Sequence, residues 1–149
     1  EPQVPPEAAS ALRRAHYRPR PRLAEGRLLR KAGVSAAIDV SDGLADDLGK
    51  LCQASGVAAR VDLARIPVHP ALAGADPATA RELALYGGED YELLFTAPAD
   101  TVDDVAARAS LPVTVIGAVA SGPPGQVWLV EADGGEALAT PRGWNHFSR

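Results

Sequence analysis

Residues 34–63 read VSAAIDVSDGLADDLGKLCQASGVAARVDL, and the pattern of this stretch decides the fold class. The apolar run 34–40 predicts a buried strand, and Ser-Asp-Gly at 41–43 then turns the chain. Leu44, Leu48, Leu51 and Cys52 recur at helical spacing until Gly56, a residue typical of a helix C-terminus. Another strand is predicted over 57–63. The order strand, turn, helix, strand indicates a fold that mixes helices with a sheet.

The rest of the chain continues this alternation. Helices are predicted over 7–15, 23–32, 78–85 and 101–109, strands over 91–97 and 113–119, and a hairpin over 127–130 and 137–140. The Arg/Pro-rich segment 18–22 is interpreted as a solvated linker, with a phosphate-binding arm as the alternative. We expect an α+β fold with a mixed sheet packed against helices. Residues 1–32 then form a linker and N-terminal helical segment, and 33–149 a single domain.

Composition limits the class of protein. With 46% apolar and 23% charged residues, the 149-residue chain is expected to fold into a globular domain. A net charge of -4 argues against a nucleic-acid-binding surface. Cys52 is the single cysteine, so an intrachain disulfide is impossible, and a small core side chain is the favoured interpretation. Without an apolar run of membrane-spanning length or a signal peptide, a cytoplasmic location is expected.

Oxygen-bearing side chains gather where the first strand meets its helix. Asp39 lies in an apolar strand, and a buried carboxylate needs a cation, a metal or hydrogen-bond donors. Because side chains alternate along a strand, Asp39 and Ser41 face the same side, and Asp42 follows at the turn. Such ligands suit Mg²⁺, and the helix N-terminus can accept phosphate oxygens. The alternative is that Ser41 or Asp42 only caps the helix.

Two other segments carry possible chemistry. Gly87-Gly88-Glu89-Asp90-Tyr91-Glu92 places two glycines and three carboxylates before a predicted strand, although a loop with solvated acids is equally compatible. Near the C-terminus, Trp144 can cover the edge of the core or stack on a flat heterocycle. The sequence lacks a Walker-type phosphate loop, a Gly-x-Gly-x-x-Gly motif and a Cys/His cluster for zinc.

Three segments together resemble the thiamine-monophosphate kinase family, in the same order and with similar spacing. They are Ile38-Asp39-Val40-Ser41-Asp42-Gly43-Leu44, Gly87 to Phe95 as GGEDYELLF, and Gly143-Trp144-Asn145-His146-Phe147. The resemblance implies the C-terminal domain fold of the superfamily that includes aminoimidazole ribonucleotide synthetase. In that superfamily ATP binds between two domains, and an N-terminal domain, absent here, dimerises and holds most of the metal-binding aspartates.

The resemblance also implies residue roles. Asp39 and Asp42 correspond to Mg²⁺ ligands, Ser41 to an ATP contact, and Glu89 and Trp144 to contacts with thiamine monophosphate. The implied reaction transfers the γ-phosphoryl group of ATP, a co-substrate, to thiamine monophosphate and gives thiamine diphosphate, without a protein nucleophile. The full-length protein is expected to be a homodimer, and this chain alone to be inactive. The alternatives are another ATP-dependent enzyme of the superfamily or a non-catalytic nucleotide-binding module.

Overall fold

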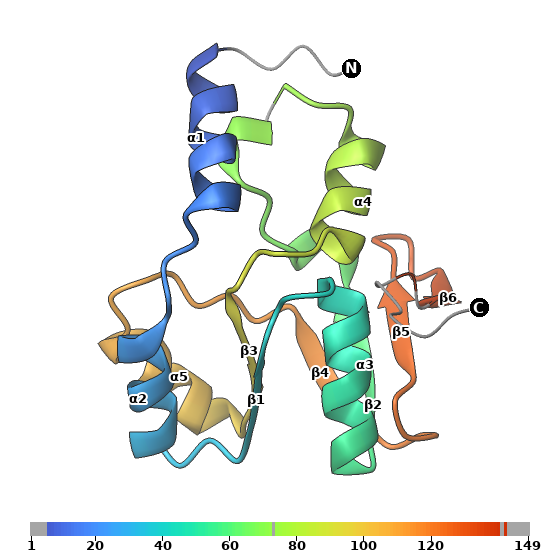
Figure 1. Ribbon diagram of the computed structural model, residues 1–149. Helices are drawn as coiled ribbons and strands as arrows, with labels where there is room; N and C mark the ends of the chain where they lie inside the picture. Colours follow the sequence, from blue (N-terminus) through green and yellow to red (C-terminus); the bar gives the residue numbers. More distant parts are fainter. Residues whose placement is uncertain (1–5, 73, 141, 143–149) are drawn as a thin grey trace, which may run out of the picture.

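The computed structural model describes residues 6–72, 74–140 and 142, and Figure 1 shows the order of their helices and strands. The helical elements are α1 (Pro6–Tyr17), α2 (Leu23–Lys31), α3 (Leu44–Ser55), the 3-10 turns η1 (Leu63–Arg65) and η2 (Pro70–Leu72), α4 (Pro77–Tyr86) and α5 (Ala99–Arg108). The strands are β1 (Ala36–Asp39), β2 (Ala58–Asp62), β3 (Leu93–Thr96), β4 (Gly117–Ala120), β5 (Val127–Val130) and β6 (Glu136–Leu138). Every helix and strand predicted from the sequence is confirmed, with shifted ends.

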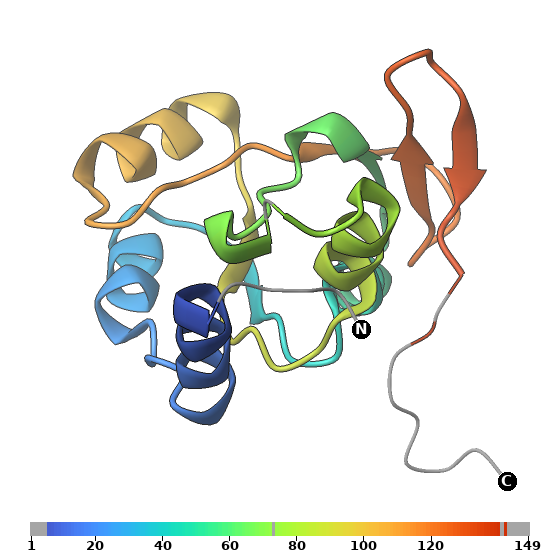
Figure 2. The same ribbon diagram turned by 90° about the horizontal axis from the view of Figure 1, so that it is seen from above.

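The strands form two sheets. β1 pairs antiparallel with β3, so that Ala36 lies opposite Thr96 and Asp39 opposite Leu93. The other sheet has the order β4-β2-β5-β6, in which β2 and β5 are parallel and the other neighbours antiparallel. This confirms the expected mixed sheet. Helices α2 and α5 lie at one end of the molecule and the β5–β6 hairpin at the other (Figures 1 and 2).

Helix α3 contacts both sheets and connects them through the core. It touches β1, β2, β5 and α4. Its apolar side chains Leu48 and Cys52 join Val61, Leu85 and Val127 in one buried cluster. Cys52 is 1% exposed and burial raises the pKa of its thiol, which confirms the interpretation as a core residue. No helix in the described part of the chain is long and apolar enough to cross a membrane.

The prediction of a fully buried first strand was wrong. Along β1 the side chains alternate, with Ala37 and Asp39 exposed, and Val40 directly after the strand is buried. The physical reason is that β1 belongs to a two-stranded sheet packed on α3 from one side. The Asp39 carboxylate is therefore in contact with water and does not need the buried partner that the apolar sequence suggested.

Candidate functional site

The turn before α3 is built around Gly43. This residue is the N-cap of the helix and has φ of +117°, a conformation that side chains rarely adopt. A Cβ atom at position 43 would lie 3.1 Å from the backbone of Tyr86, so the glycine also lets α4 approach the head of α3. No side chain caps the helix. The alternative in which Ser41 or Asp42 is the cap is therefore wrong.

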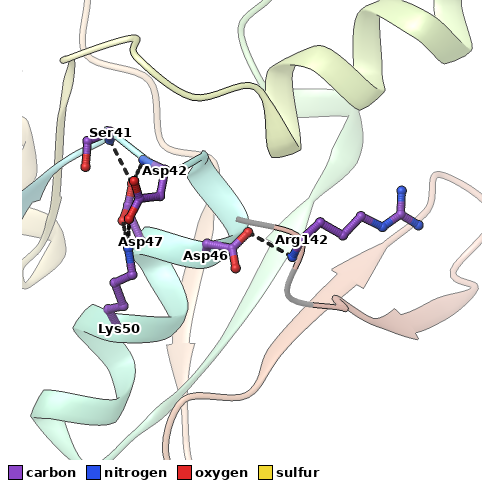
Figure 3. A network of polar contacts seen from close by, with 6 residues as sticks. All are labelled: Ser41, Asp42, Asp46, Asp47, Lys50 and Arg142. Atoms are coloured by element: carbon purple, nitrogen blue, oxygen red, sulfur yellow. Dashed lines mark hydrogen bonds and ion pairs between the residues drawn. The ribbon is translucent and has the colours of Figure 1, made fainter. Parts of the chain in front are cut away.

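A buried carboxylate on α3 holds the backbone of this turn in place. Asp47 is 1% exposed, and its Oδ2 accepts hydrogen bonds from the backbone N–H groups of Ser41 at 2.8 Å and Asp42 at 2.9 Å. Its Oδ1 accepts a hydrogen bond from Lys50 Nζ at 2.7 Å. Lys50 also forms an ion pair with Asp42. Figure 3 shows Lys50 reaching up from α3 to both aspartates.

These contacts shift the pKa values of Asp47 and Lys50. Burial alone would raise the pKa of Asp47, but the hydrogen bonds from Lys50, Asp42 and Ser41 outweigh it and lower that pKa. The hydrogen bonds to Asp42 and Asp47 raise the pKa of Lys50. Asp47 therefore stays ionised at neutral pH, beside the charged ammonium group of Lys50.

Sequence reasoning missed the role of Asp47. The residue lies off the apolar stripe of α3, a position that predicts exposure to solvent. A usable signal was present, because the N–H groups just before a helix need acceptors, and an acidic side chain in the first turn can reach back to them. Here the aspartate replaces a side-chain cap, and its charge is buried only because these donors surround it.

The Gly-Gly-Glu-Asp-Tyr-Glu loop lies directly against this turn. The N–H of Glu89 donates to the carbonyl oxygen of Ser41 at 2.8 Å, and the N–H of Tyr91 donates to that of Val40 at 2.8 Å. In return, the N–H of Val40 donates to the carbonyl oxygen of Glu92 at 2.9 Å. The backbone thus joins the two segments that the sequence marked for chemistry, although they lie far apart along the chain.

The loop has an unusual backbone where it meets the turn. Glu89 and Tyr91 have φ of 69° and 50°, in the left-handed region that costs free energy for residues with a side chain. A Cβ atom on Gly88 would stand 2.7 Å from the Ser41 carbonyl oxygen, so only glycine allows this close approach. The backbone hydrogen bonds to Val40 and Ser41 offset the strain.

Side chains of this loop meet the N-terminal segment. Glu89 Oε2 lies 3.2 Å from His16 Nδ1 of α1. Glu92 receives a two-point contact from the Arg22 guanidinium, with Nε at 2.8 Å from Oε2, and this hydrogen bond raises the pKa of Arg22. Arg22 is therefore held in place, unlike a residue of the solvated linker predicted for 18–22.

Asp90 lies in a groove between α1, the 18–22 segment and the loop. The groove is lined by Arg14, Arg18, Arg20, Arg22, Asp90 and Glu92, among others. Partial burial and then the charge of Glu92 raise the pKa of Asp90. Asp90 is at an exposed position, so water screens both effects.

The three oxygen-bearing side chains expected to converge here, the predicted metal ligands Asp39 and Asp42 and the predicted ATP contact Ser41, are not all gathered at one point. Ser41 and Asp42 lie at the head of α3, whereas Asp39 lines a separate groove with Arg22, Arg27 and Leu93. Among the residues that the structure describes, no three His, Cys, Asp or Glu side chains are grouped to hold a metal ion. Asp42 nevertheless accommodates a positive charge, since Lys50 is bound to it. Its carboxylate therefore fits a cation, while a complete metal site would require further ligands.

Arg142 lies close to the same region. The N–H of Arg142 donates to Asp46 Oδ2 at 3.2 Å, on the side of α3 away from Lys50 in Figure 3. The Arg142 guanidinium pairs with Glu82 and lies 4.7 Å from the centre of the Tyr86 ring. The predicted substrate contact Trp144 lies outside the described residues.

Comparison with known proteins agrees with this architecture. Residues 4–130 match the family model of AIR synthase related protein, C-terminal domain. Thiamine-monophosphate kinase of Escherichia coli strain K12 is 38% identical over 144 residues, which cover 94% of this chain and 43% of that protein. The curated relatives are therefore longer, and this chain spans about two fifths of their length.

Solved structures are similar as well. The crystal structure of thiamine-monophosphate kinase from Stenotrophomonas maltophilia K279a is 42% identical, with a TM-score of 0.77 over 87% of this chain and 40% of that one. AaThiL complexed with AMPPCP and TMP is 33% identical, with a TM-score of 0.77 over 99% of this chain and 44% of that one. The family match over residues 4–130 and these structures show that the chain belongs to the family of AIR synthase related proteins, as a C-terminal domain.

Proposed function

We propose that this chain is the C-terminal part of a kinase that transfers the γ-phosphoryl group of ATP to thiamine monophosphate and forms thiamine diphosphate. The observation that carries the proposal is the backbone junction between Ser41 and Glu89. It brings the turn that we propose to bind the nucleotide and the metal next to the loop that we propose to bind the acceptor. The similarity to AaThiL complexed with AMPPCP and TMP, over 99% of this chain, supports the same assignment.

The proposed roles divide between the two segments. Ser41 contacts the nucleotide, Asp39 and Asp42 contribute to Mg²⁺ binding, and Glu89 with Trp144 binds the acceptor. When bound, Mg²⁺ neutralises phosphate charge and orients the phosphate groups. The protein's own task is positioning, because phosphoryl transfer needs alignment of two anionic substrates more than a protein nucleophile. Asp47 serves this by fixing the backbone of Ser41 and Asp42.

The catalytic unit is proposed to be larger than this chain. The chain spans about two fifths of its curated relatives, and its described residues lack a group of three metal-binding side chains. We therefore propose that a further domain supplies the missing ligands, and that the full-length protein is a cytoplasmic homodimer. The 149-residue chain alone is expected to form little or no thiamine diphosphate, and measurable formation by it would contradict this part of the proposal.

The test is the formation of thiamine diphosphate by the full-length protein from ATP and thiamine monophosphate, measured by chromatography. Asp42→Asn and Glu89→Gln are each expected to lower kcat/KM by about tenfold to a thousandfold, the usual range when an electrostatic contact to reacting groups is lost. Asp46→Asn is the matched control, because Asp46 lies nearby in the first turn of α3 but accepts a hydrogen bond from the N–H of Arg142. Unchanged kcat/KM in both variants would refute the assigned site.

Two rivals are separated by related measurements. If other phosphate acceptors react and thiamine monophosphate does not, the protein is a different enzyme of the superfamily. If calorimetry shows binding of Mg-ATP but no acceptor is phosphorylated, the protein is a nucleotide-binding module.

A further inference from the structure

We infer that His16 is a positioning residue, which orients the Glu89 carboxylate for the phosphate acceptor. The starting observation is that His16 Nδ1 lies 3.2 Å from Glu89 Oε2. His16 belongs to the last turn of α1, and Figure 2 shows this helix beside the segment between α4 and β3 that carries Glu89. At this separation Nδ1 carries a proton, because its lone pair would otherwise face the negative oxygen.

The Glu89 side chain requires a partner to adopt one orientation. Its backbone is fixed by the hydrogen bond from its N–H to the carbonyl oxygen of Ser41, at 2.8 Å. The side chain beyond this point is 55% exposed, and an exposed glutamate samples several rotamers unless a contact selects one. His16 contacts Oε2 and leaves Oε1 for a ligand. A carboxylate that is oriented before the ligand arrives loses less conformational entropy on binding.

The imidazole ring of His16 is itself held in place. It packs edge to face against the Tyr17 ring, with the ring centres 5.0 Å apart and the planes at 72°. The segment after α1 is attached to the same loop a second time, since the Arg22 guanidinium makes a two-point contact with Glu92. These contacts fix the end of α1 relative to Glu89.

Stability does not explain the contact between His16 and Glu89. The two side chains are 54% and 55% exposed, and α1 has no buried residue. An exposed pair of this kind contributes little to the free energy of unfolding. Removal of the imidazole is therefore expected to leave the fold intact and to release the Glu89 carboxylate.

This inference rests on the proposed function, in which Glu89 contacts thiamine monophosphate. Failure of the proposed function appears in the full-length wild type, which then forms no thiamine diphosphate, and the inference falls with it. Failure of the inference alone appears in an active wild type whose kinetics do not respond to the loss of His16.

The first experiment measures the kinetics of the full-length protein. His16→Leu is expected to raise the KM for thiamine monophosphate about two- to fivefold, the factor that an exposed pair contributes, with kcat and the KM for ATP unchanged. His16→Asn keeps an N–H donor near the place of Nδ1 and is expected to restore the wild-type KM. The control is His69→Leu, which removes another exposed histidine, whose Nδ1 accepts from the N–H of Ala71.

A double-mutant cycle tests whether His16 acts through Glu89. In Glu89→Ala, the additional change His16→Leu is expected to leave the KM for thiamine monophosphate where Glu89→Ala has set it. If the additional change raises this KM by the same factor as in the wild type, His16 acts independently of the carboxylate, and the inference is overturned.

The second experiment observes the contact itself in the 149-residue chain, which contains both partners. The imidazole NMR signal of His16 is expected to shift in Glu89→Ala, while that of His69 stays fixed. This shift, together with the selective rise in the KM for thiamine monophosphate, supports the inference. An unmoved His16 signal, an unchanged KM in His16→Leu, or an equal rise in the KM for ATP would overturn it. If His16→Leu does not fold, His16→Ala takes its place.

Discussion

The backbone N–H of Glu89 donates a hydrogen bond of 2.8 Å to the carbonyl oxygen of Ser41. This single contact links the loop proposed to bind the acceptor with the turn proposed to bind the nucleotide. Because the link is made by the backbone, it depends on the conformation of the loop and not on the identity of the two side chains. Substitutions that disturb the backbone here are therefore expected to affect both stability and the site.

Gly88→Ala is expected to disturb this junction. The added methyl group would lie 2.7 Å from the Ser41 carbonyl oxygen, and two backbone segments would have to move apart. We expect a loss of about 1–3 kcal/mol in the free energy of unfolding, as for other overpacked positions, measured by chemical denaturation. Gly74→Ala is the control, because nothing lies within 4 Å of a Cβ atom there. Equal stability of the two variants would contradict the close approach.

Asp47→Asn is expected to destabilise the chain because it weakens the hydrogen bonds that hold the turn before α3. Asparagine has one acceptor oxygen in place of two, so an N–H group of the turn or the ammonium group of Lys50 loses its partner. We expect a loss of about 2–4 kcal/mol in the free energy of unfolding. Asp46→Asn keeps an acceptor for the N–H of Arg142 and should change stability by less than about 0.5 kcal/mol. Similar losses in the two variants would show that Asp47 does not hold the turn.

The sequence predicted those elements whose signals are local. Helix α3 follows from the spacing of Leu48 and Cys52, and its end at Gly56 is confirmed by a left-handed φ of 70°. The β5–β6 hairpin likewise follows from two short apolar runs around Asp133-Gly134-Gly135, with Gly134 at a φ of 85°. In these segments neighbouring residues supply most of the information, so periodicity and turn residues were sufficient.

The features that the sequence did not reveal depend on distant parts of the chain. The pairing of β1 with β3, which leaves Asp39 exposed, joins strands separated by α3, β2 and α4. Asp47 looked like a surface residue because helical periodicity counts apolar side chains and takes no account of free N–H groups in a preceding turn. The same limit hid the contact of His16 with Glu89, which becomes visible only when α1 is placed beside the loop.

Glu92→Gln is expected to release Arg22 from the loop. The pair is partly exposed, so its loss should lower the free energy of unfolding by only about 0.5–1 kcal/mol. Limited digestion with trypsin is the more sensitive measurement. Arg18 and Arg20 precede prolines, which trypsin cleaves poorly, whereas Arg22 precedes Leu23 at the start of α2. Cleavage after Arg22 should become faster in Glu92→Gln and stay at the wild-type rate in Glu131→Gln, which releases Arg81 instead. Unchanged cleavage in Glu92→Gln would contradict the tethering role.

Asp90→Asn is expected to stabilise the protein in a manner that depends on pH. Partial burial and the charge of Glu92 raise the pKa of Asp90 above its usual 3.8, so the fold favours the protonated form. The favourable contribution of Asp90 is complete below pH 3.8 and is lost as the pH rises through the pKa in the folded state. At pH 7 the ionised carboxylate therefore lowers the stability of the folded state, and asparagine removes this unfavourable charge.

The measurement for Asp90 is the melting temperature across this range. Asp90→Asn should melt above the wild type at pH 7, and the difference should shrink as the pH falls and vanish below 3.8. Asp103→Asn, at an exposed position of α5, is the control for the loss of one exposed carboxylate. A gain that is the same at every pH would point to a cause other than the charge of Asp90. Destabilisation at pH 7 would show that the ionised carboxylate is stabilised in its groove, with Arg14, Arg18 and Arg20 as the nearby cations.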